Sequence, residues 1–139
     1  MLENVRKRMG REEGFTLVEL LVVMLILGIL AAIAIPSFLS QRDKADDAEA
    51  KASVRTAQTA AETYGTDNDN DYTAMDSAAL IAIEPTLGDT PGPLTVTGDV
   101  DEYSVTVESE TGNTFTIDRV GGTTDQTCTG GGGCNGGTW

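Results

Sequence analysis

A single apolar segment near the N-terminus most constrains what this chain can fold into. Residues 15–35 read FTLVELLVVMLILGILAAIAI, 21 residues with one charged side chain, Glu19. As an α-helix rising about 1.5 Å per residue, this segment extends roughly 30 Å, the thickness of the hydrocarbon core of a bilayer. A buried helix of a soluble domain is the alternative, but the polar and acidic remainder of the chain cannot cover such a helix on all sides. The sequence therefore predicts one membrane-spanning helix.

The charges on either side of this segment predict its orientation. Residues 1–14 carry four basic and three acidic side chains, whereas residues 36–139 carry five basic and 18 acidic ones. Because basic flanks stay in the cytoplasm, we expect a single-pass protein of the cytoplasmic (inner) membrane with its C-terminal part outside. A secretory signal peptide cleaved after the Ala-Ile-Ala at 32–34 is the alternative. The apolar run is longer than the roughly 7–15 residues typical of signal peptides, and Glu19 has no use in one.

The composition argues against several classes of function. The chain has no histidine, which excludes a Ser-His-Asp triad, a Cys-His pair and an imidazole metal site. Its two cysteines cannot form a four-cysteine zinc site. A net charge of −13 opposes binding to a phosphate backbone, and the glycines at 130–133 lack the Lys-Ser/Thr that follows in a P-loop. We therefore expect no enzymatic activity and no direct nucleic-acid partner.

Glu19 is the unusual residue of the apolar run. A carboxylate in a membrane helix costs about 2–3 kcal/mol on insertion scales, and no Lys or Arg of the run can pair with it. One explanation is that Glu19 reaches water at the membrane surface. Its sequence context gives another, because GFTLVE at 14–19 follows a short basic leader and opens the apolar run. This arrangement resembles the class III leader of type IV prepilins and pseudopilins.

The resemblance implies a processing step and a partner for Glu19. In this family a prepilin peptidase, which is also a methyltransferase, cuts after the glycine and methylates the new N-terminal amine. By resemblance, residues 1–14 are a cleaved leader, cleavage falls between Gly14 and Phe15, and Phe15 is N-methylated. The amine of Phe15 in one subunit is then expected to meet Glu19 of a neighbour, since opposite charges attract strongly at low dielectric.

The resemblance also implies a function. It indicates a structural subunit that leaves the membrane at an inner-membrane assembly platform and polymerises with copies of itself and other pilins into an extracellular type IV pilus-like filament. A pseudopilin of a type II secretion or DNA-uptake system has the same leader and helix. An alternative of another class is a calcium-binding surface module that is anchored by the helix and does not polymerise.

The helix is expected to continue beyond the membrane segment. Pro36 matches the proline of the family's first helix, so we expect a kink near it, loosened by Gly28. Residues 36–64 are rich in helix formers and carry an apolar stripe at spacings of three and four: Ala50, Val54, Ala57, Ala61 and Tyr64. Gly65 is expected to cap the helix. A further expectation is an ion pair, one helical turn apart, between Asp47 and Lys51.

Residues 65–93 are predicted to form a connecting loop with a short helix over 75–83. Three carboxylates alternate at the start of this loop as in a calcium-binding loop: Asp67, Asp69 and Asp71. The full pattern fails, because Tyr72 stands at the glycine position and Ala78 at that of the closing glutamate. A solvated loop is therefore the preferred interpretation, with calcium as the weaker one.

Apolar and polar residues alternate in three runs, at 94–97, 103–107 and 115–117. This alternation predicts three strands joined by short turns. Their apolar side chains are expected to face the helix stripe: Tyr103, Val105, Val107, Phe115 and Ile117. Residues 94–122 are thus predicted to form a small three-stranded antiparallel sheet. A long N-terminal helix packed on such a sheet is an α+β fold and agrees with the type IV pilin fold that the leader implies.

Residues 123–139 are predicted to form a glycine-rich C-terminal loop. Cys128 and Cys134 enclose four consecutive glycines. Their disulfide would stabilise the fold by at most about 2–3 kcal/mol. A redox-active pair is less favoured, because there is no CxxC spacing and no basic neighbour to depress a thiol pKa. The terminal Trp139 either packs against the sheet or is exposed.

Overall fold

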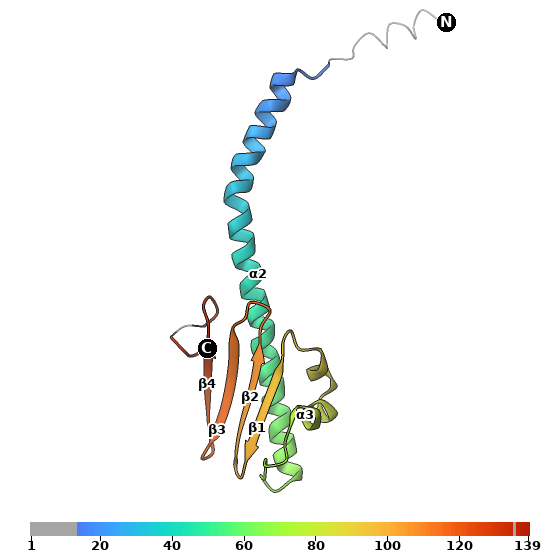
Figure 1. Cartoon of the computed structure of the whole chain (residues 1–139), viewed down its shortest axis with the longest axis vertical. Helices are drawn as coiled ribbons and strands as arrows, with labels where there is room; N and C mark the ends of the chain where they lie inside the picture. The colour runs from blue at the N-terminus through green and yellow to red at the C-terminus, as the bar shows by residue number, and fades with distance from the viewer. Residues whose placement is uncertain (1–13, 135) are drawn as a thin grey trace, which may run out of the picture. The chain divides into compact units, whose positions relative to one another are not determined.

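The computed structural model describes residues 14–134 and 136–139. The chain divides into two compact units, Met1–Phe38 and Leu39–Trp139, and one helix, α2, runs through the boundary between them. Figure 1 shows the elements in chain order: α2 (Leu17–Asp67), α3 (Ser77–Ile83), the 3-10 helix η1 (Pro85–Asp89), β1 (Leu94–Asp99), β2 (Glu102–Glu108), β3 (Thr114–Val120) and β4 (Thr123–Thr129). The expected α+β class, with a long N-terminal helix and an antiparallel sheet, is confirmed.

Helix α2 contains 51 residues, and Pro36 lies inside it rather than at its end. The helix therefore continues through the proline, as expected, while the kink stays a prediction. The expected cap at Gly65 is wrong, because α2 ends two residues later at Asp67. The chain turns at Asp69 and Asn70, whose φ angles are 55° and 62°. Asp and Asn tolerate this left-handed backbone better than most side chains do, so Gly65 is not needed for the turn.

In the first unit, α2 is apolar on all sides. Among the described residues it is the one helix long and apolar enough to cross a membrane, with a mean hydropathy of 2.9 in its best 18-residue window. None of the residues in that window is buried. The large aliphatic and aromatic side chains from Phe15 to Phe38 are accordingly exposed. In a soluble chain such a surface would be an aggregation hazard, so these residues need lipid or other helices around them.

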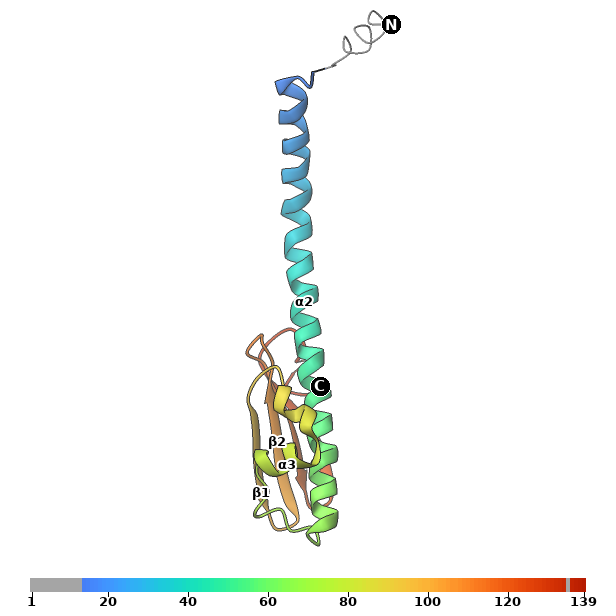
Figure 2. The same cartoon turned by 90° about the vertical axis from the view of Figure 1, so that its right-hand side faces the viewer.

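In the second unit, the predicted stripe of α2 packs on the sheet (Figure 2). Ala50, Val54, Ala57 and Ala61 are fully buried, and Tyr64 packs at the margin of the same core. Every predicted inward residue of the sheet is at most 3% exposed: Tyr103, Val105, Val107, Phe115 and Ile117. Because the helix presents mainly alanines, its backbone can approach the sheet closely. The predicted facing of helix and sheet is confirmed.

The sheet has four antiparallel strands in the order β1-β2-β3-β4, so the prediction of three was wrong. The fourth strand, β4, lies in the segment that was expected to be an irregular C-terminal loop. Only Cys128 of β4 is buried, so the strand has no apolar alternation to reveal it. It forms by backbone pairing with β3, which aligns Phe115 with Cys128. Gly121 and Gly122 connect the two strands with positive φ angles of 59° and 80°, which suit a tight hairpin turn.

The predicted short helix is present as α3. Its N-cap is Asp76, whose carboxylate accepts a hydrogen bond from the backbone N–H of Ala79 at 2.8 Å. The helix stops before Glu84 and Pro85, as the sequence indicates. The segment between α2 and β1 completes the core with four buried apolar side chains: Tyr72, Met75, Leu80 and Leu87.

Candidate functional site

The N-terminal end of α2 holds Glu19 by a reciprocal cap. Glu19 Oε2 accepts hydrogen bonds from the Thr16 backbone N–H (2.9 Å) and from Thr16 Oγ1 (2.8 Å). In return, the Glu19 N–H donates to Thr16 Oγ1 at 3.2 Å. This arrangement is a capping box, which satisfies donors that a helix N-terminus otherwise leaves unpaired. The sequence reasoning missed Thr16, although the Thr-x-x-Glu spacing was there to be read.

The cap changes how Glu19 can be understood. Its carboxylate is partly satisfied by its own chain, which reduces the penalty of placing it in an apolar segment. Both bonds from Thr16 fall on one oxygen, and a carboxylate can accept about four hydrogen bonds in all. The group therefore keeps capacity for an external donor such as an ammonium. Gly14 and Phe15 precede the helix, and Phe15 is 77% exposed. The rest of the predicted leader, residues 1–13, lies outside the described residues.

Gly28 is not explained by contacts within the chain. A Cβ atom added to it would meet nothing within 4 Å. Its small size is therefore not required by packing in the single chain, whereas a small residue on an apolar helix permits close approach of another helix. Pro36 lies eight residues further along the same helix.

The candidate calcium loop does not form a ligand cluster. Across residues 14–134 and 136–139, no group of three Asp, Glu, His or Cys side chains is placed to hold a metal ion. Asp71 is engaged locally, because its Oδ1 accepts hydrogen bonds from Thr73 N (2.9 Å) and Thr73 Oγ1 (2.6 Å). These bonds lower the pKa of the exposed Asp71 carboxyl. Asp67 and Asp69 do not join Asp71 in such a group.

A second polar site, which the sequence reasoning missed, surrounds Asp47. Its side chain faces into the second unit and is only 2% exposed. The carboxylate accepts hydrogen bonds from four residues: Ser109 Oγ (2.8 Å), Thr111 Oγ1 (2.7 Å), Asn113 Nδ2 (2.9 and 3.1 Å) and Gly133 N (3.0 Å). Three of these donors come from the turn between β2 and β3, and the fourth comes from the C-terminal loop. A buried anion is tolerable here because donors surround it.

The expected ion pair between Asp47 and Lys51 is wrong. Asp47 turns inward to the loops, while Lys51 Nζ donates to the backbone carbonyl of Gly133 at 2.7 Å. The Lys51 ammonium also lies 5.1 Å from the centroid of the Phe115 ring. Asp47 and Lys51 each bond to the C-terminal loop instead of to each other, because the loop offers partners that the fold holds in place.

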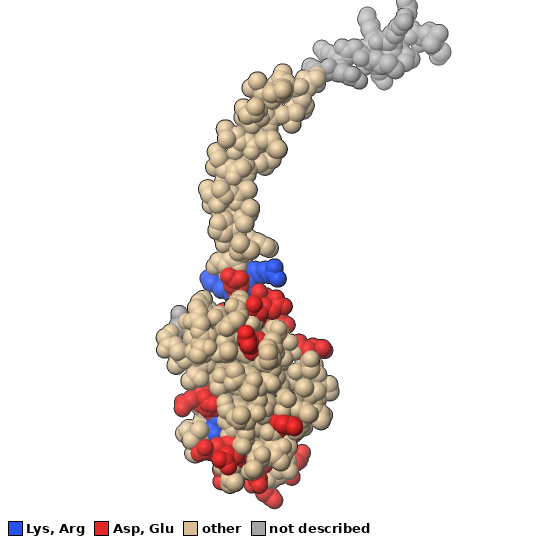
Figure 3. Space-filling model, viewed as in Figure 1, with Lys and Arg blue, Asp and Glu red and all other residues tan. Residues whose placement is uncertain are grey.

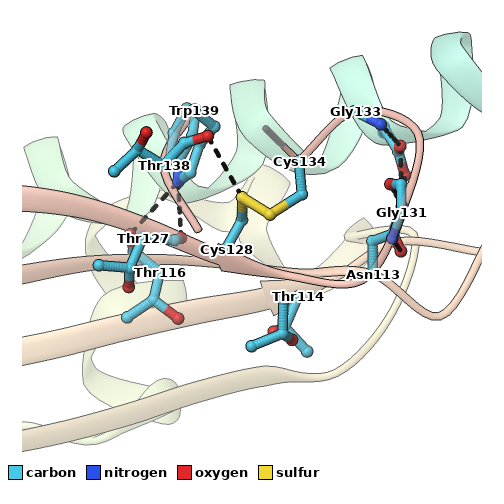
Figure 4. The surroundings of a disulfide bond; sticks show 12 residues. Asn113, Thr114, Thr116, Thr127, Cys128, Gly131, Gly133, Cys134, Thr138 and Trp139 are labelled. Atoms are coloured by element: carbon cyan, nitrogen blue, oxygen red, sulfur yellow. Dashed lines mark hydrogen bonds between the residues drawn. A yellow bond between two sulfur atoms is a disulfide. The ribbon is translucent and has the colours of Figure 1, made fainter. Parts of the chain in front are cut away.

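Cys128 and Cys134 form the predicted disulfide, with their Cα atoms 5.7 Å apart. Figure 4 shows the loop that this bond closes, with Asn113, Gly131 and Gly133 gathered at one side and Trp139 at the other. Trp139 packs against the core rather than standing exposed. Its ring meets that of Phe115 edge to face at 5.7 Å, and its Nε1 donates to Thr127 O at 2.8 Å.

The surroundings of Asp47 predict a pH dependence. Burial alone raises the pKa of this carboxyl, but the hydrogen bonds from Thr111, Ser109, Asn113 and Gly133 outweigh burial and hold the pKa below its usual value. The ionised form therefore stabilises the fold above the unfolded-state pKa of about 3.9, and this contribution disappears as the pH falls through the lower folded-state pKa.

We therefore expect the stability difference between the wild type and Asp47→Asn to be constant above about pH 5 and to shrink below about pH 4. Thermal unfolding of the full chain in detergent, followed by circular dichroism at several pH values, measures this difference. The matched control is Asp46→Asn, because Asp46 pairs only loosely with Arg42 at 3.9 Å. A difference for Asp47→Asn that does not change between pH 3 and 6 would contradict the prediction.

The charged groups of the second unit are predominantly acidic. Residues 39–139 contain 18 acidic and five basic side chains. In the view of Figure 3, acidic side chains are scattered over the surface of this unit. An excess of one charge keeps such a surface soluble and discourages unspecific association.

An apolar helix that opens with a capped glutamate, followed by a helix-on-sheet unit, is a pilin-like layout. A family model, the prokaryotic N-terminal methylation motif, matches residues 9–35. The chain therefore carries this motif at the start of its long helix.

Similar proteins are found among both pilins and secretion proteins. Type II secretion system core protein G of Aeromonas hydrophila is 33% identical over 81 residues, 58% of this chain and 57% of that protein. Type IV wide pilus major component PilA4 of Thermus thermophilus is 42% identical over 87 residues, 63% of each chain. Type IV major pilin protein PilA of Myxococcus xanthus is 39% identical over 82 residues, 59% of this chain and 36% of that protein. The chain spans little more than half the length of the core protein G relatives. No solved structure matches significantly.

Proposed function

We propose that this protein is a structural subunit of a type IV pilus-like filament. The observation that carries the proposal is the apolar segment of α2, whose exposed side chains are interrupted by one carboxylate at its N-terminal end. Such a segment is suited to two environments, the lipid bilayer before assembly and a core of like helices afterwards. The similarity to pilins named as major components supports this function.

The proposed processing creates the partner of Glu19. Prepilin peptidase removes residues 1–14 and methylates the amine of Phe15, which then carries a positive charge. In the filament this amine approaches Glu19 of a neighbouring subunit and uses the capacity that the bonds from Thr16 leave on the carboxylate. Because either charge alone is unfavourable in an apolar core, the pair selects one axial register between subunits.

Polymerisation transfers the apolar segment from lipid to the filament core. Gly28 and the alanines at 31, 32 and 34 permit close helix approach there. The acidic second units coat the filament and keep it soluble. Before assembly the protein is a single-pass inner-membrane protein with its N-terminus in the cytoplasm, and after assembly it is extracellular. Copies of itself, other pilins and an assembly platform are its partners.

A pseudopilin role is the second candidate. It is favoured by the similarity to type II secretion system core protein G from several bacteria. A pseudopilin would share the processing and the helix packing, and would differ in making a short secretion filament rather than a surface fibre. The place where the processed chain accumulates distinguishes the two.

Mass spectrometry of the N-terminal peptide tests the processing and the location together. We expect a peptide that begins at Phe15 and is heavier by one methyl group, because the GFTLVE segment carries the cleavage motif. Abundance in fibres sheared from cells supports a pilus subunit, whereas confinement to membranes supports a pseudopilin. Gly14→Val is the control variant and should retain the leader. A wild-type peptide that begins near residue 35 would indicate a signal peptide and contradict both roles.

A further inference from the structure

The glycine-rich loop is held by side chains from two other elements. Four consecutive glycines have almost no conformational preference, so residues 130–133 should be costly to order. Yet Asn113 forms two hydrogen bonds with the backbone of Gly131, from Nδ2 to Gly131 O (2.8 Å) and from Gly131 N to Oδ1 (3.1 Å). Gly133 is held from both sides, by Asp47 at its N–H (3.0 Å) and by Lys51 at its carbonyl (2.7 Å). The path of the loop is therefore determined outside the loop.

Two of the glycines are required by this close approach. A Cβ atom on Gly133 would lie 2.5 Å from Asp47 Oδ2 and 3.0 Å from its Cβ. A Cβ atom on Gly130 would overlap the side-chain amide of Asn113. Gly131 differs, because a Cβ atom there would meet nothing within 4 Å. Gly130 and Gly133 thus have a steric reason to be glycine. A methyl group on Gly131 would have room and would leave its two backbone hydrogen bonds with Asn113 in place, so Gly131 provides a matched control.

These contacts lie next to the disulfide and involve none of its atoms. Gly133 immediately precedes Cys134, and the other cysteine, Cys128, is placed by its pairing with Phe115 in the sheet. Fixing Gly133 on helix α2 therefore fixes where Cys134 lies relative to Cys128. We propose that Asp47 is a positioning residue for disulfide formation, because it holds the loop so that the two thiols already lie together in the reduced chain.

The chemical step needs an external oxidant. The Sγ–H bonds of Cys128 and Cys134 break, one S–S bond forms, and two protons and two electrons leave. A small-molecule disulfide such as oxidised glutathione accepts them and becomes two thiols. The protein contributes the effective concentration of one thiol near the other, and positioning by Asp47 raises this concentration. Asp47 takes no part in the exchange itself.

The test measures the equilibrium between reduced and oxidised protein. The full chain in detergent is incubated with set ratios of reduced to oxidised glutathione and then quenched with acid. The free thiols are alkylated, and mass spectrometry measures the fractions of reduced and oxidised protein. We expect Asp47→Asn to lower the equilibrium constant for oxidation about tenfold, because loss of a buried charge-assisted hydrogen bond changes an equilibrium by about that factor or more. Asp46→Asn removes the same charge one residue away, without touching the loop, and should leave the constant unchanged.

A second pair of variants tests the same contact from the loop side. Gly133→Ala places a methyl group against Asp47 and should also lower the constant, whereas Gly131→Ala should not. A purely structural role for Asp47 would destabilise the oxidised and reduced chains equally and leave the constant unaltered. Equal constants for wild type, Asp47→Asn and Gly133→Ala would therefore overturn the proposal, even if the variants unfold at lower temperature. The outcome does not depend on whether the chain forms filaments.

Discussion

Replacement of Glu19 by alanine is expected to abolish filament formation while membrane insertion and leader cleavage continue. The variant removes the one charged group of residues 15–35 and with it the proposed partner for the Phe15 amine of the next subunit. A more apolar segment inserts in the membrane at least as well. In the assembled core, however, each positive amine would be left without a counter-charge, which is strongly unfavourable at low dielectric. The measurement is the yield of sheared fibres relative to processed protein in membranes.

Two further variants test whether assembly requires the charge of Glu19 rather than the size of its side chain. Glu19→Gln keeps the size of the side chain and a hydrogen bond with Thr16 but loses the charge, so it should also fail to assemble. Leu20→Ala removes an exposed apolar side chain from the adjacent position and should assemble nearly as the wild type does. Filament yields that are normal for both Glu19 variants would refute the proposed pairing of amine and carboxylate.

Replacement of Phe115 by alanine is expected to reduce the stability of the second unit by about 3–5 kcal/mol. Phe115 is fully buried near the start of the inner strand β3, where its ring meets Trp139 and lies close to the Lys51 ammonium. Removing it leaves a cavity among residues that cannot all move inward. Thermal unfolding of the full chain in detergent, followed by the near-ultraviolet signal of Trp139, measures the effect.

The control for this variant lies on the same strand. Val120 ends β3 and is 54% exposed, so Val120→Ala should change the stability by less than about 0.5 kcal/mol. Phe115→Ala should still be inserted and processed, because residues 14–38 are unaltered. A stability loss below about 1 kcal/mol for Phe115→Ala would mean that the core contracts around the missing ring.

The parts of the fold that sequence could predict are those with a repeating apolar pattern. The stripe from Ala50 to Ala61 and the alternation in β2 and β3 each put apolar side chains on one face, and that face is buried in the structure. Strand β4 escaped prediction because it is held by backbone pairing, and its mostly polar side chains carry no such pattern. The Gly-Gly turn before it was the available signal.

Of the two candidate sites, the sequence indicates the one at Glu19 but not the one at Asp47. Glu19 was evident because a single charge in an apolar run is conspicuous, and its cap by Thr16 follows from local spacing alone. Asp47 was assigned to a surface pair with Lys51, because sequence shows neighbours along a helix and not donors that come from the distant loops near Asn113 and Gly133. Its burial depends on a tertiary arrangement that no local pattern encodes.

The strand order of the sheet has a consequence for how the second unit folds. Each strand pairs with the next one in sequence, and the connections at 100–101, 109–113 and 121–122 are short. Pairing between near neighbours closes small loops and is therefore fast. If residues nearer the N-terminus become available first, each hairpin can form in turn and pack on the apolar face of α2. Cys134 follows all four strands in the sequence, so its disulfide with Cys128 forms after the residues of the whole sheet are available.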